Sequence, residues 1–181
     1  VIINWLDDAI RARLQSMLAA HYSDMDVHIQ AARRIEGQGI EIRGLSIGTL
    51  HEETAYRDLL SIDELFLECN TSLSELLRGN LQGRRLILRR LKLHATCHRN
   101  GQWNVARLLP MPSFGGSVPT IVLEDGTLEL QDLCRPSGDS WVCRNISIRA
   151  RAKLNDQGER RWRFSGNVLG DHFKHVALQG A

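Results

Sequence analysis

Residues 84–109, RRLILRRLKLHATCHRNGQWNVARLL, are the stretch that decides the predicted fold. Aliphatic and charged residues alternate from Leu86 to Cys97, and the side chains of a β-strand point alternately to its two faces. The alternation therefore predicts a long strand with one aliphatic and one charged face. It slips by one residue at Arg89 and Arg90, which predicts a β-bulge there.

The second half of this stretch predicts a turn followed by a short helix. Asn100 and Gly101 tolerate positive φ angles and favour a tight turn. Apolar residues then follow at helical spacing over residues 103–109. Pro110 would end that helix, because proline lacks a backbone N–H donor.

The remaining segments predict one more substantial element and a series of strands. Residues 1–20 carry apolar side chains at steps of three and four, which predicts an amphipathic helix. Residues 73–79, ended by a glycine, predict a second short helix. Asp125 and Gly126 predict a hairpin turn, and Gly44 a second bulge. The expected strands are residues 27–35, 39–48, 59–69, 119–124, 127–133, 145–154, 160–169 and 173–181.

These elements predict a mainly β fold with some α-structure. The expected architecture is an N-terminal amphipathic helix followed by a curved, trough-like antiparallel β-meander with two short inserted helices. No Gly/Ser-rich linker divides the chain, so residues 1–181 are expected to form one domain. The chain has no start Met, and residues 173–181 resemble a strand without a partner, so we expect a piece of a longer protein.

The composition excludes several function classes. There are 23 Lys and Arg against 21 Asp and Glu, a net charge of +2, which is not the clustered positive charge of a nucleic-acid-binding protein. No run of apolar residues is long enough for a transmembrane helix. The sequence contains no nucleophile elbow and no phosphate-binding loop, and His51-Glu52-Glu53 lacks the second His of the helical zinc motif. We therefore predict a non-enzymatic protein without a metal or cofactor.

Two smaller features of the sequence are a basic cluster and a pair of cysteines. A basic cluster on the long strand is either the solvated face of that strand or a contact for anionic lipid headgroups; it comprises Arg84, Arg85, Arg89, Arg90 and Lys92. Cys134 and Cys143 flank a Pro/Gly turn, which predicts that a hairpin brings them together and that they form a disulfide in an oxidising compartment.

Several segments read together resemble the AsmA-like family of bacterial envelope proteins, which is related to the bridge-like lipid-transfer proteins. They are INWLDDAIRARLQSML, GIEIRGLSIG, LLSIDELFLECNTSLSELLRGNLQGRRLILRRLKL, NGQWNVARLLP and PTIVLEDGTLELQD, which together span residues 2–133. The resemblance implies the N-terminal region of a periplasmic protein that is held at the inner membrane of a double-membrane bacterium by an anchor upstream of residue 1.

The resemblance also implies a function that needs no chemistry. An AsmA-like trough would bind or conduct phospholipid or other acyl chains between the inner and outer membranes along an aliphatic face. The residues expected to line it are Leu65, Leu67, Leu86, Leu88, Leu91, Leu93, Ile121, Leu123, Ile146, Ile148, Trp162 and Phe164. The alternative is a structural or protein-interaction domain of the envelope in which helices cover the same residues. Alternation alone predicts both equally well.

Overall fold

The computed structural model describes residues 2–49, 58–70, 72, 82–112, 118–135, 137–154, 160–170 and 173–180. Within these ranges, one α-helix and one 3₁₀-helix accompany eight strands. The helices are α1 (Ile2–His21) and η1 (Asn104–Leu108). The strands are β1 (Met25–Ile35), β2 (Gly39–Thr49), β3 (Asp58–Cys69), β4 (Gly83–Cys97), β5 (Thr120–Asp132), β6 (Ser140–Leu154), β7 (Arg160–Gly170) and β8 (Phe173–Gly180).

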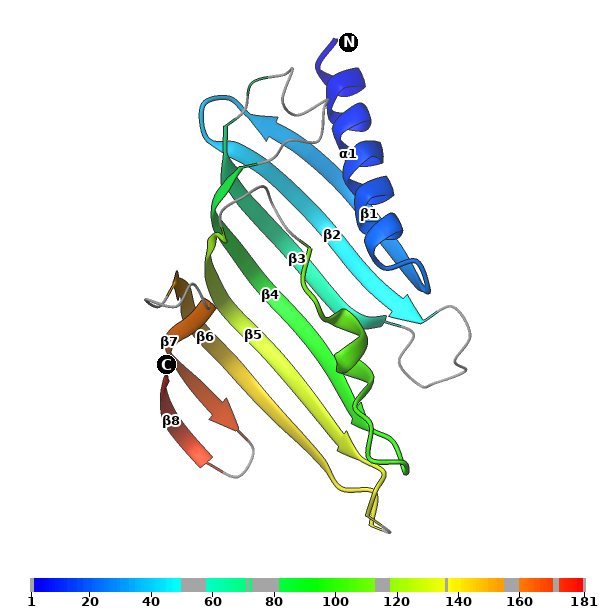
Figure 1. Ribbon diagram of the computed structural model, residues 1–181, viewed down its shortest axis with the longest axis vertical. Coiled ribbons are helices and arrows are strands. Elements are labelled where there is room, and N and C mark those ends of the chain that lie inside the picture. The colour runs from blue at the N-terminus through cyan, green and yellow to red at the C-terminus, as the bar shows by residue number, and fades with distance from the viewer. Residues whose placement is uncertain are drawn as a thin grey trace.

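The eight strands form one open, twisted sheet in the order of the sequence, β1 to β8 (Figure 1). This confirms the predicted β-dominated fold with an N-terminal helix. The predicted meander is wrong at one step, because β4 and β5 pair in parallel, with Arg85 opposite Thr120 and Cys97 opposite Asp132. After β4 the chain turns, passes through η1 and returns to the end of the sheet where β4 began. A parallel pair needs a crossover of about a dozen residues or more, and residues 98–119 provide it.

The two predicted short helices and the predicted Asp125-Gly126 turn compare with the structure as follows. Residues 103–109 contain a 3₁₀-helix and not an α-helix. The second predicted short helix, residues 73–79, lies outside the described residues. Asp125 does not close a hairpin. It takes a left-handed conformation (φ 56°) inside the continuous strand β5, so the predicted Asp125-Gly126 turn is wrong.

The hydrophobic core lies between α1 and the first four strands. Ile10 and Leu14 of α1 are buried against apolar side chains of β1, β2 and β3, and Leu86 of β4 joins the same cluster. Figure 1 shows α1 lying along β1, on one face of the sheet. Among the described residues, no helix is both long and apolar enough to cross a membrane.

A crease crosses the sheet at one level from β1 to β5 and continues, slightly displaced, into β6. At the crease each strand turns two consecutive residues away from the apolar face: residues 30–31, 43–44, 63–64, 89–90 and 124–125, and residues 144–145 of β6, where the β5–β6 ladder shifts its register. Four of them have left-handed φ angles: Gly44, Arg90, Asp125 and Asn145. The change of face at Gly44 and Arg90 is present, but the β-bulges predicted to cause it are wrong. The ladder between β2, β3 and β4 keeps its one-to-one register there, because neighbouring strands change face together.

Candidate functional site

The apolar face of the sheet continues without interruption from the core to the later strands. Directly paired residues of neighbouring strands lie on the same face of a sheet. One row of such pairs runs across β3, β4, β5 and β6 through Leu65, Leu88, Leu123 and Ile148. The side chains that fill the core and those of β5 and β6 therefore belong to one surface.

The first part of this surface is covered. Leu65, Leu67 and Leu86 are 7%, 2% and 9% exposed and belong to the core under α1. Leu88 and Leu91 are half-buried and pack against the edge of that core. Among the expected lipid-contacting residues, the three that the core buries are packed as structural side chains.

The second part carries large apolar side chains that do not belong to this core. Ile121, Leu123 and Ile148 are half-buried, as is Trp162, and Phe164 is 39% exposed. Within the described residues, α1 packs mainly on β1 and η1 on β4, and neither has its main contacts with β5 to β8. Of the other residues expected to contact lipid, Leu93 is half-buried and Ile146 is buried.

On the opposite face of the sheet, carboxylates pair with Arg89 and Arg90 of the basic cluster. Arg89 bonds Glu124 at 2.8 Å and lies 3.4 Å from Glu64, while Arg90 lies 2.9 Å from Asp63 and 3.0 Å from Glu64. The hydrogen bond that Arg90 donates lowers the pKa of the Glu64 carboxyl, and the hydrogen bond that Arg89 donates to Glu124 raises the pKa of Arg89. These ion pairs favour a solvated strand face over a headgroup site.

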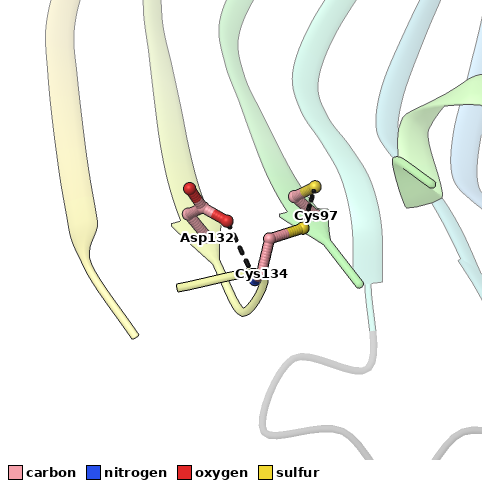
Figure 2. A group of neighbouring side chains, drawn as sticks. All are labelled: Cys97, Asp132 and Cys134. Atoms are coloured by element: carbon pink, nitrogen blue, oxygen red, sulfur yellow. Dashed lines mark hydrogen bonds between the residues drawn. The ribbon is translucent and has the colours of Figure 1, made fainter. Parts of the chain in front are cut away.

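The ends of β4 and β5 hold a group that the sequence reasoning missed. The Sγ atoms of Cys97 and Cys134 are 2.8 Å apart, and a carboxylate oxygen of Asp132 lies within 4.8 Å of both (Figure 2). This is the one group of three potential metal-ligating side chains found in the described part of the chain. The parallel pairing of β4 with β5 creates it, and an antiparallel meander would have kept Cys97 away.

The structure does not bring Cys143 to Cys134, so the predicted proximity is corrected. Cys143 lies opposite Leu128 in the β5–β6 ladder, whereas Cys134 follows the end of β5 at Asp132. At roughly 3.3 Å per residue, Leu128 and Asp132 are about 13 Å apart, well beyond the roughly 7 Å between the Cα atoms of bridged cysteines. The hairpin ladder continues past Cys143 before it turns.

Of the candidate metal ligands considered in the sequence, His51, Glu52 and Glu53 lie outside the described residues.

Comparisons with protein-family models, with curated proteins and with solved structures found no match. The AsmA-like resemblance therefore rests on the segments of the sequence alone, and the role of the apolar face has to be argued from its geometry.

Proposed function

We propose that this chain is a non-enzymatic lipid-binding module whose ligand is the acyl part of phospholipid or another acyl lipid. The observation that carries the proposal is the row of paired apolar residues that leaves the covered core at Leu88 and continues through Leu123 to Ile148. Monomeric proteins seldom expose contiguous apolar patches above a few hundred Å², and larger ones commonly bind something apolar.

The chemistry of this face suits acyl chains better than a polar ligand. Its centre is aliphatic, and Trp162 and Phe164 lie farther along it on β7, paired with Ala152 and Ala150. Burial of apolar area contributes about 25 cal/mol per Å² and requires no hydrogen bonds. Binding is therefore expected to be tolerant of lipid headgroup.

The proposed lipid site is smaller than the site expected from the sequence. Leu65, Leu67 and Leu86 hold the fold together, and the lipid would lie over the face of β4 to β7. In line with the AsmA-like resemblance, the proposal places the module in the periplasm on an inner-membrane anchor upstream of residue 1. Acyl chains would pass along it between the two membranes.

The test compares one charge on each face of the same strand. Ile148→Glu places a carboxylate on the apolar face, while Ser147→Glu places it on the exposed opposite face of β6. The wild type should bind a phospholipid with a fluorescent acyl chain and retain phospholipid in native mass spectrometry. Ile148→Glu should lose both signals and keep a folded thermal transition, because a charge among acyl chains is unfavourable. Ser147→Glu should behave like the wild type.

The alternative is a structural or protein-interaction domain of the envelope, and one observation favours it. The side chain of Ile146 is only 8% exposed although it lies on β6, far along the sheet from α1, so part of this face is already packed. A wild type without bound lipid, together with an Ile148→Glu variant that unfolds, would support this alternative and refute the lipid proposal.

A further inference from the structure

The chain brings two cysteines together through backbone contacts at the ends of two parallel strands. Cys97 is the last residue of β4, and its carbonyl oxygen accepts a hydrogen bond from the N–H of Leu133 at 2.9 Å. The N–H of Cys134 in turn donates to the Asp132 carboxylate at 2.9 Å. The first contact holds the turn after β5 against the end of β4, and the second lies within that turn; the two thiols face each other (Figure 2).

The distance between the two sulfurs suits a covalent bond better than a shared metal ion. In a disulfide the sulfurs are about 2.05 Å apart, so the observed 2.8 Å requires a movement of less than about 1 Å. Two thiolates on one tetrahedral zinc ion, each about 2.3 Å from it, lie roughly 3.8 Å apart. The group also offers three ligand side chains, whereas structural zinc sites have four.

We propose that Cys97 and Cys134 form an intramolecular disulfide by exchange with a disulfide-containing oxidant, either a small molecule or a protein. The thiolate of one cysteine attacks the oxidant and forms a mixed disulfide, which releases one thiol. The second cysteine then attacks the protein sulfur of that mixed disulfide and releases the other thiol. Two protein thiols become one disulfide, and one oxidant disulfide becomes two thiols.

Exposure sets the order of the two steps. Cys134 is exposed and meets the oxidant first, whereas Cys97 is 6% exposed and completes the bond from inside. The neighbouring Cys97 thiol, with smaller effects of burial and of Asp132, raises the pKa of Cys134 to about 11. Because the thiolate is the attacking species, exchange is slow near neutral pH and accelerates as the pH rises.

The bond would tie the start of the crossover between β4 and β5 to the turn that follows β5. Cys97 also forms a bridge with Trp103, just before η1, and the side-chain amide of Asn104 bonds the backbone of Thr96 and of His94. A disulfide at Cys97 therefore joins three segments at one point: the end of β4, the start of η1 and the turn after β5.

The experiment exposes the folded chain to oxidised glutathione in the presence of EDTA, unfolds it in denaturant, alkylates the free thiols and maps the peptides by mass spectrometry. The expected product has lost two hydrogen atoms, carries a Cys97–Cys134 linked peptide and alkylates at Cys69 and Cys143. Cys97→Ser and Cys134→Ser should each abolish the intramolecular linkage, while Cys143→Ser, the matched control on β6, should retain it. A Cys134–Cys143 peptide, or four alkylated cysteines after prolonged exposure at pH 9, would overturn the proposal.

Two further measurements separate this bond from a metal site and test its mechanism. The rate of linkage should rise roughly tenfold per pH unit between pH 7 and 9. Asp132→Asn keeps an acceptor for the Cys134 N–H and removes the negative charge, so it should accelerate linkage a few-fold at pH 7. Zinc retained by the reduced chain in equimolar amount and lost in Cys134→Ser, with no linkage after its removal, would identify a metal site instead.

Discussion

The part of the sheet under α1 and the part beyond β4 have the same sequence pattern but different packing. In both, apolar side chains alternate with polar ones, and the strands pair in the order of the chain. Ile29 and Ile40 on the first two strands are fully buried, whereas Phe164 on β7 is 39% exposed. The difference teaches that alternation defines a face, while the element laid over that face decides whether it becomes a core.

The largest effect is expected from truncating a side chain in the covered part. Leu67→Ala removes buried methyl groups and leaves a cavity, which should lower the free energy of unfolding by about 2–5 kcal/mol. Ile148→Ala, in the part beyond β4, should cost about 1 kcal/mol because Ile148 is only partly buried. Urea unfolding of the two variants measures both values, and equal losses would mean that the second part is also a packed core.

A smaller effect is expected at the crease, which both parts share. Gly44 has a φ of +60°, and a Cβ there would lie 2.6 Å from the Gln30 side-chain oxygen, so Gly44→Ala should cost about 1–2 kcal/mol. Asn145 has a similar φ of 51° in the part beyond β4, so Asn145→Gly relieves strain and should leave the stability unchanged or slightly higher. Thermal unfolding distinguishes them, and a neutral Gly44→Ala would show that the crease is not fixed.

The smallest effect concerns the ion pairs on the solvent face of the crease, which link β3 and β4 of the covered part to β5. The folded-state pKa of Glu64 is lowered by Arg90, so its contribution to stability is present above the ordinary Glu pKa. That contribution is lost as the pH falls through the lower folded-state value. Glu64→Gln should therefore reduce the difference in stability between pH 7 and pH 3. An unchanged pH profile would show that this exposed network contributes nothing measurable.

The sequence was sufficient to predict the strands but not their directions. Alternation from Leu86 to Cys97 identifies β4 and its faces, because it depends on the side-chain period alone. Parallel and antiparallel strands show the same alternation of apolar and polar residues. The sequence pattern therefore could not indicate that the chain returns through η1 and pairs β5 in parallel with β4. The meeting of Cys97 with Cys134 depends on that return and could not be predicted without it.

The Asp125-Gly126 pair shows a second limit of local patterns. The same dipeptide suits a hairpin turn and a left-handed residue within a strand, since both need a positive φ. Its neighbours on β4 decide the outcome, because Arg89 and Arg90 turn outward at the same level and Arg89 bonds Glu124. The long-range pairing therefore overrides the local turn preference.

The crease acts on the sheet as a half-period phase shift applied to five adjacent strands, β1 to β5, at the same level. On either side of it the side chains of each strand alternate between the two faces, and the two alternations differ by one residue. Deleting one residue there in a single strand, such as Arg90, would put one end of that strand out of phase with both neighbours. Its charged side chains would then point into the apolar face while the adjacent strands stayed in step.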